Sequence, residues 1–348
     1  MFQRQDIMRR VVYSLVPLFL FATLLYGWRV IVAVVVTFAF GIATEYVFER
    51  SRKKKVSEAV LVTCSLYALS LPPNTPVWIT IVGIVFAVGM AKGVYGGFGR
   101  NVFNPAISGR LFIYVSFPAV LTTSWMVPAL VDASGGLTLF GLGNVLGTSG
   151  VVGVDALSAA TPLAIIRGGQ LPNLWHLFLG FRGGSFGESS TLLILGAAVY
   201  LIYTKTANWR LIISTFLSAL GFATVFYALG WIPGLDPTVY SGVQHLAPIA
   251  AYLMSGSILY VAVFMSTDPV SGPAKPLAQW AYGFLIGGIT ILVRAFGGFP
   301  EGTSFGIMVA NTFSALLDEI FPKPKKKAKK VVKPKAVPAG TGAQEVKA

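Results

Sequence analysis

The sequence predicts an all-α polytopic membrane protein with about ten transmembrane helices. Apolar residues make up 55% of the 348 residues, charged residues make up 11%, and the mean hydropathy is +0.72. The apolar residues fall in blocks of roughly 16 to 20, and helices of that length approach the thickness of a hydrocarbon core of about 30 Å. Because these blocks recur along the whole chain, the composition excludes an ordinary soluble enzyme.

Ten segments are expected to cross the membrane, and an even number of crossings puts both termini on one side. The segments are 11–28, 30–48, 56–71, 77–91, 104–121, 189–204, 211–230, 246–265, 278–293 and 304–321. Basic residues lie before the first segment at Arg4, Arg9 and Arg10, and after the second between positions 50 and 55. The positive-inside rule therefore predicts cytoplasmic termini.

The same pattern divides the chain into a short cytoplasmic N-terminus (1–10), a membrane domain (11–321) and a tail (322–348). Between Lys323 and Lys347 the tail holds nine lysines and one acid, and so carries more than half of the net charge of +14. With few apolar residues it is expected to be a disordered cytoplasmic appendage. The positive net charge of the chain therefore does not indicate nucleic-acid binding.

Two interruptions of the apolar pattern stand out. The third and fourth segments are short, are separated by Leu71-Pro72-Pro73-Asn74-Thr75-Pro76 and are followed by a glycine-rich stretch. Such segments mark binding sites in membrane proteins built from repeats, although an ordinary tight outer turn is an equal alternative. The largest gap, 122–188, follows five crossings and is expected to face outward.

Metal chemistry is not expected from this chain alone. One cysteine, Cys64, and two histidines, His176 and His245, cannot supply an iron–sulfur cluster, a zinc site or a bis-histidine haem. Redox chemistry here would need an organic cofactor.

Three X-Pro pairs are expected to start helices: Asn104-Pro105, Thr161-Pro162 and Asp268-Pro269. Each places a good N-cap residue before a proline in the first helical position. A helix N-terminus offers unpaired N–H groups and a positive dipole end, which suit a carbonyl-rich or anionic ligand. For any one pair, a simple helix cap at the interface is the commoner explanation.

The surrounding residues identify a family. The patterns N-x-x-N-P-A at 101–106, D-x-x-S-x-A-T-P at 155–162 and T-D-P-V-S at 267–271 occur in this order. In this combination the chain, over roughly residues 10–321, resembles the NqrB/RnfD family, the membrane flavoprotein subunits of the sodium-pumping quinone reductase and the Rnf ferredoxin–NAD complex. The resemblance implies a fold similar to urea channels, with two inverted five-helix repeats.

The resemblance implies a covalent flavin on Thr161. In the family, an extracytoplasmic flavin transferase joins FMN through its phosphate to this threonine, and Asp155, Ser158 and Ala160 match its recognition positions. The count of crossings independently places Thr161 on the outer face, where such a transferase works. Without the motif, a threonine before proline would be an ordinary turn or cap.

The resemblance also implies a second, non-covalent flavin, riboflavin, toward the cytoplasmic side. Asn101, Asn104 and Asp268 match the motif positions expected to contact it. Asparagine donates and accepts hydrogen bonds, and a flavin edge presents both carbonyls and ring nitrogens. A cap without a ligand is the alternative for Asp268.

Two other charged residues lie in apolar segments. Glu45 is a candidate for ion coupling, but we expect it to reach the cytoplasmic surface beside Arg50. Arg110 is expected either to balance the charge of a reduced flavin or to anchor its helix at the interface. His176 and His245 are given no role.

The short stretch before the first segment and the sequence Ser116-Phe117-Pro118 favour the Rnf branch. The implied function is an electron relay in an ion-translocating (Na⁺ or H⁺) complex of the bacterial inner membrane, with a second covalent-FMN subunit and iron–sulfur subunits as partners. Ser108-Gly109-Arg110 is closer to the quinone-reductase branch, which stays an alternative. A solute channel or transporter of similar fold, or a purely structural subunit, would also fit the pattern of spans.

Overall fold

The computed structural model of the chain describes residues 2–126, 128, 161–297 and 302–321. Asp155, Ser158 and Ala160, about half of the expected outer loop and the expected basic tail lie outside these residues.

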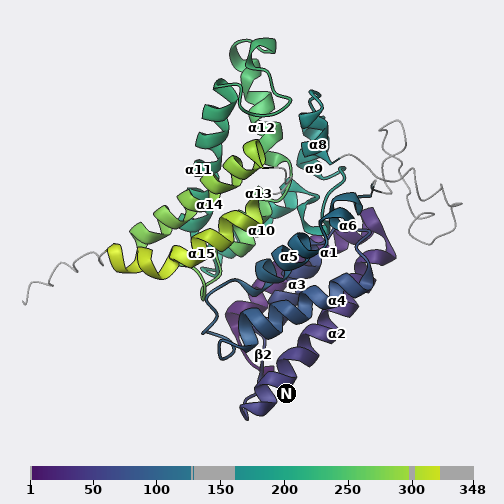
Figure 1. Cartoon of the computed structure of the whole chain (residues 1–348), viewed down its shortest axis with the longest axis vertical. Helices are drawn as coiled ribbons and strands as arrows, with labels where there is room; N and C mark the ends of the chain where they lie inside the picture. Colours follow the sequence, from purple (N-terminus) through teal and green to yellow (C-terminus); the bar gives the residue numbers. More distant parts are fainter. Residues whose placement is uncertain (1, 127, 129–160, 298–301, 322–348) are drawn as a thin grey trace, which may run out of the picture.

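Almost all of the regular secondary structure in the described chain is helical (Figure 1). Its first half contains α1 (Asp6–Tyr26), α2 (Trp28–Ser51), α3 (Ala59–Ser70), α4 (Val77–Val88), η1 (Gly89–Gly93), α5 (Pro105–Ser116) and α6 (Pro118–Thr123). Its second half contains α8 (Pro162–Arg167), α9 (Leu174–Leu179), η3 (Phe186–Glu188), α10 (Thr191–Tyr203), α11 (Trp209–Ala228), η4 (Pro237–Val239), η5 (Gly242–His245), α12 (Leu246–Met254), α13 (Ile258–Tyr260), η6 (Val261–Met265), α14 (Pro276–Phe296) and α15 (Thr303–Ile320). One parallel pair, β1 (Phe2–Gln3) with β2 (Val56–Ser57), ties the N-terminus to the start of α3.

The all-α polytopic membrane fold is confirmed. Each of the ten predicted segments contains a helix, but among the described residues only α1, α2, α11 and α14 are long and apolar enough to cross a membrane alone. The pair formed by Gly242–Met254 and Ile258–Met265, bent by 65°, makes a fifth crossing if it is one broken span. The inverted repeat stays a prediction.

Several predicted spans are shorter than the apolar blocks suggested. Helices α3 and α5 have 12 residues each and α10 has 13, and at 1.5 Å per residue each covers about 18 to 20 Å, well short of a hydrocarbon core. The predicted segment 104–121 is divided at Phe117, because Pro118 follows it and cannot continue the helix. These short helices bring helix ends and irregular backbone into the interior.

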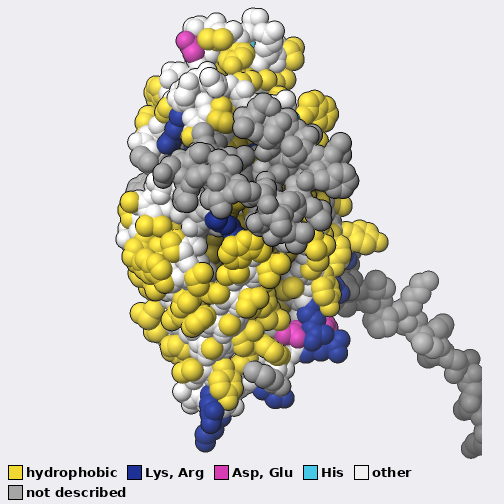
Figure 2. Space-filling view, turned by 90° about the vertical axis from the view of Figure 1, so that its right-hand side faces the viewer, with side chains coloured by type: hydrophobic (Ala, Val, Ile, Leu, Met, Phe, Trp, Pro, Cys, Tyr) yellow, Lys and Arg dark blue, Asp and Glu magenta, His cyan; other side chains and the backbone are white. Residues whose placement is uncertain are grey.

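The helices form two packed groups, which Figure 1 shows as α1–α5 below and α11, α12 and α14 above. Small residues allow close packing of α11 on α14: a Cβ at Gly287 would lie 2.6 Å from the nitrogen of Ala219. Helix α15 contacts both α14 and α5 and so joins the groups. Figure 2 shows apolar side chains over much of the lower part of the visible face, with most of the visible Lys and Arg side chains near its lower end.

Candidate functional site

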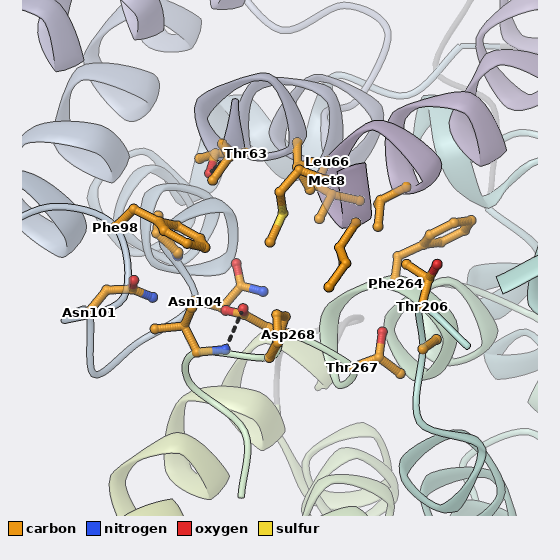
Figure 3. Close-up of a pocket in the computed structure, with 18 of the residues that line it drawn as sticks. Met8, Thr63, Leu66, Phe98, Asn101, Asn104, Thr206, Phe264, Thr267 and Asp268 are labelled. Carbon is orange, nitrogen blue, oxygen red and sulfur yellow. Dashed lines mark hydrogen bonds between the residues drawn. The ribbon is translucent and has the colours of Figure 1, made fainter. Parts of the chain in front are cut away.

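The largest group of predicted site residues lies around one cavity, which is lined by segments from both halves of the chain (Figure 3). We call it the Asn104 cavity; it has about 690 Å³ of empty space, including its mouth. Its polar lining includes Asn101, Asn104, Asp268, Thr63, Thr206, Thr267 and Lys92, and its apolar lining includes Met8, Leu66, Phe98 and Phe264. The structure therefore brings Asn101, Asn104 and Asp268 together from the two halves of the chain.

Asn104 starts α5 as predicted. Its Oδ1 accepts a hydrogen bond from the N–H of Ala106 at 3.0 Å, and Pro105 follows in the first helical turn. Its Nδ2 also donates to the carbonyl of Met265 at 3.3 Å, at the end of η6. One buried amide thus caps a helix of the first half and contacts the second half.

Asp268 does not start a helix, so that prediction was wrong. Helix α14 begins at Pro276, because Gly272 and Pro273 interrupt the chain after Asp268. The carboxylate instead closes a tight turn, accepting from the N–H of Val270 at 3.1 Å and the hydroxyl of Ser271 at 2.7 Å.

Asp268 and Asn101, which also line this cavity, differ in their local surroundings. Burial raises the pKa of the Asp268 carboxyl, against the lowering effect of its hydrogen bonds. The Nδ2 of Asn101 donates to the carbonyl of Phe103 at 3.1 Å, which holds the loop before α5. Both side chains therefore have local structural roles as well as a place in the cavity wall.

Lys92 also lines the Asn104 cavity, although no sequence motif singled it out. Its Nζ lies 2.6 Å from Glu45 Oε2 and 2.9 Å from Ser57 Oγ, and its side chain is 2% exposed. The expectation that Glu45 reaches the surface beside Arg50 was wrong, because α2 turns Glu45 toward η1. A lysine directly after a predicted span was the available signal.

Two π-helical turns lie beside this cavity. Lys92 belongs to η1, and Phe264 and Met265 belong to η6. The wider π-helical turn is rare in proteins, but a large share of those that occur lie at functional sites, where the turn redirects side chains. Apolar periodicity cannot reveal such a local change in hydrogen bonding.

Thr161 lines a second cavity, here called the Thr161 cavity, with about 330 Å³ of empty space. Its other lining residues include Trp125, Arg182, Gly183, Gly184, Glu188 and Gly256. Thr161 Oγ1 accepts from the N–H of Ala164 at 3.3 Å, so the predicted cap is present. Helix α8 has only six residues, however, so its dipole is weak.

Arg110 extends from α5 toward this second cavity. It lies 3.6 Å from Glu188, and both side chains are at most 4% exposed. The expectation that Arg110 anchors α5 at the interface is therefore wrong, because the residue is buried. Asn104, the N-cap of α5, thus lies at the Asn104 cavity. Six residues later, Arg110 pairs with Glu188, which lines the Thr161 cavity.

Comparison with known proteins identifies the family of this chain. The model of the NQR2, RnfD, RnfE family matches residues 2–327. The chain belongs to this family.

The curated relatives of this chain come from both the quinone-reductase branch and the Rnf branch of the family. A subunit of the Na⁺-translocating NADH-quinone reductase of Chromohalobacter salexigens is 35% identical over 82% of this chain, which spans 64% of that relative's length. A subunit of the ion-translocating oxidoreductase complex of Shewanella amazonensis is 30% identical, covering 91% of this chain and 92% of the relative. A subunit of the Na⁺-translocating ferredoxin:NAD⁺ oxidoreductase complex of Acetobacterium woodii is also 30% identical, covering 90% and 87%.

The two cavities of this family member differ in chemical character. The Asn104 cavity combines aromatic and aliphatic walls with convergent amides and a carboxylate, which suits a flat, hydrogen-bonding ring. The Thr161 cavity is smaller and has a buried arginine, which suits an anionic group.

Proposed function

We propose that this chain is the electron-relay membrane subunit of an Rnf-type ion-translocating ferredoxin–NAD oxidoreductase complex. In this proposal FMN is ester-linked to Thr161 and riboflavin is bound in the Asn104 cavity. The observation that carries it is the convergence of Asn101, Asn104 and Asp268 on one cavity, since the motif residues come from distant segments. The Shewanella amazonensis and Acetobacterium woodii relatives, matched over most of their length, support the Rnf branch.

The residues of the chain have positioning roles in this function, and bound flavins would supply the ability to accept and donate electrons. Asn104 and Asn101 would present amide groups to the ring edge, and Asp268 would accept from an N–H or a ribityl hydroxyl. The aromatic rings of Phe98 and Phe264 would cover the flat faces and exclude water.

The proposal includes an orientation and a set of partners. Both termini would face the cytoplasm of a bacterial inner membrane, and Thr161 would face outward, within reach of a flavin transferase. Electrons would enter from a second covalent-FMN subunit on the outer side and return toward the cytoplasm, where iron–sulfur subunits bind. The translocated ion would be Na⁺ or H⁺.

In-gel fluorescence tests the covalent flavin. The chain is produced with and without an extracytoplasmic flavin transferase, denatured, and compared with Thr161→Ala under ultraviolet light. We expect a fluorescent band only when both the transferase and Thr161 are present. A dark wild-type band beside an active transferase would refute the covalent flavin.

Extraction of free flavin tests the Asn104 cavity. Asn104→Ala removes a helix cap, which costs about 1 kcal/mol, together with the proposed flavin contact. Asn208→Ala is a matched control, because Asn208 caps α11 in the same way through a 3.3 Å bond to Arg210 N–H. We expect purified Asn104→Ala to lose its acid-extractable riboflavin while Asn208→Ala keeps it. Equal riboflavin in the two variants would contradict this site.

The quinone-reductase branch is the second candidate, because a relative from that enzyme is 35% identical to this chain. Membranes containing the native complex distinguish the branches. Flavin reduction by ferredoxin supports the Rnf assignment, and NADH-driven reduction of quinone supports the quinone-reductase assignment.

A further inference from the structure

Arg182 is a buried cation in the wall of the Thr161 cavity, and no motif assigns it a role. Its side chain is 7% exposed, so its charge has lost most of its hydration. Its guanidinium donates to the carbonyl of Ser189 at 3.1 Å and to the carbonyls of Glu188 and Met254. These bonds use three of the five N–H donors of an arginine.

The described neighbours do not neutralise this charge with an anion. Within the residues that the structure describes, Arg182 forms no ion pair with a carboxylate. The acid of the cavity wall, Glu188, pairs with another cation: its Oε1 lies 3.6 Å from Arg110 and accepts from the hydroxyl of Ser185 at 2.7 Å, while its Oε2 faces Gly184. Carbonyls accept the hydrogen bonds of the Arg182 guanidinium, and Glu188 attracts it only at a longer distance. The two arginines, Arg182 and Arg110, together with the one acid, Glu188, leave this buried cluster with one net positive charge.

We propose that Arg182 binds the phosphodiester group of the flavin attached to Thr161. This inference rests on the proposed function, because the phosphodiester is the link between FMN and the threonine. A phosphodiester carries one negative charge and accepts hydrogen bonds from a guanidinium in a favourable planar geometry. Thr161 and Arg182 line the same small cavity, so the attached group enters the space beside the cation.

A glycine leaves room for this group. A Cβ built at Gly184 would meet, among the described residues, only Glu188 Oε2 within 4 Å, at a distance of 3.9 Å. A Cβ at this position would therefore occupy cavity space without displacing packed atoms. Gly184→Val fills the proposed phosphate site and leaves Arg182 in place.

Thermal unfolding with and without the attached flavin tests the proposal. Wild type, Arg182→Lys, Arg182→Gln and Gly184→Val are produced as full chains with and without the transferase and purified in the same detergent. Flavin attachment is expected to raise the wild-type unfolding midpoint by about 4 °C, as for a charge-assisted hydrogen bond in a chain of this size. The rise should vanish in Arg182→Gln and shrink in Arg182→Lys. Gly184→Val should show a weaker fluorescent band and no rise.

Comparing each variant with its own flavin-free form removes any structural effect of the substitution. If Arg182→Gln does not fold, Arg182→Lys and Gly184→Val decide the test. Arg210→Gln, at an arginine 5.2 Å from the ring centroid of Trp209 rather than in this cavity, should keep the full rise. An equal rise in wild type, Arg182→Lys and Gly184→Val, or no rise in fluorescent wild type, would overturn the proposal. A dark wild-type band would instead refute the covalent flavin itself.

Discussion

Lys92 and Glu45 form a buried ion pair at the edge of the Asn104 cavity, with Ser57 as a third member. The loss of hydration of two buried charges offsets most of their mutual attraction, so such a pair adds little net stability over apolar residues. Removing one member leaves an uncompensated charge. The pair therefore serves to hold η1 against α2 and to keep a cation in the cavity wall.

Lys92→Met is expected to lower the free energy of unfolding by about 3–5 kcal/mol, because Glu45 would remain buried without its partner. The double variant Lys92→Met/Glu45→Met should recover most of this loss. Chemical denaturation in detergent measures both. Lys54→Met, at an exposed lysine, should have little effect, and a double variant as unstable as the single one would contradict the assignment of this pair.

Among helices, the break between α12 and α13 shows how irregular backbone is kept inside the molecule. The carbonyl of Tyr252 accepts from Arg294 at 3.3 Å, and the carbonyl of Met254 accepts from Arg182. Carbonyls at a helix end need such partners where water is absent. Gly256 makes the turn with a φ of +68°, a conformation that glycine adopts without strain.

Gly256→Ala is expected to destabilise the chain more than Gly230→Ala. Both glycines have a φ of +68°, but a Cβ at Gly256 would lie 2.6 Å from Arg294 Nη2, whereas one at Gly230 would meet nothing within 4 Å among the described residues. The backbone cost, about 1 kcal/mol, is shared, so the difference in unfolding midpoint measures the contact with Arg294. Equal midpoints would show that Arg294 moves aside freely.

The start of α1 closes one side of the Asn104 cavity through Ile7, Met8 and Val11. Glu58 holds this helix in place: Arg9 donates to both of its oxygens and the N–H of Gln5 donates to Oε2. The hydrogen bonds from Arg9, and then that from Gln5, lower the pKa of Glu58 below its ordinary value of 4.5.

Acid is therefore expected to loosen the N-terminal helix. Because the folded pKa is lowered, the contribution of Glu58 is complete above about pH 4.5 and is lost as the pH falls through the folded pKa. Limited proteolysis of the N-terminus should become faster over this acidic range in wild type. Glu58→Gln should be cleaved faster at neutral pH and show a flatter pH dependence; parallel profiles would exclude Glu58 as the titrating group.

For the whole molecule, cysteine labelling at two exposed positions tests the proposed orientation in the membrane. The native cysteine, Cys64, is buried, so an introduced cysteine reports on its own position. Lys54→Cys should react with a membrane-impermeant maleimide only in inverted vesicles, and Val243→Cys, at a side chain 81% exposed, only in intact cells. Labelling of both variants from one side would contradict the predicted number of crossings between them.

Local sequence was enough for the membrane fold and for two of the three helix starts. Apolar blocks predict helices because burial in lipid depends on composition, and Asn104 and Thr161 cap helices through atoms two or three residues away. The prediction of a helix start at Asp268 was wrong because the glycine and prolines that follow it outweigh its preference for capping a helix.

Tertiary structure alone decided which residues share a cavity. No local pattern encodes the contacts of the buried charges, because the partners come from different parts of the chain. These contacts are Lys92 with Glu45, Arg110 with Glu188, and Arg182 with the end of α12. Sequence determined that this chain is a helical membrane protein and carried the motifs of its family, since helix formation, capping and burial act over short stretches. The broken helices and their packing determined the position of each buried charge, because a charge in the interior is stable only where the fold supplies its partner.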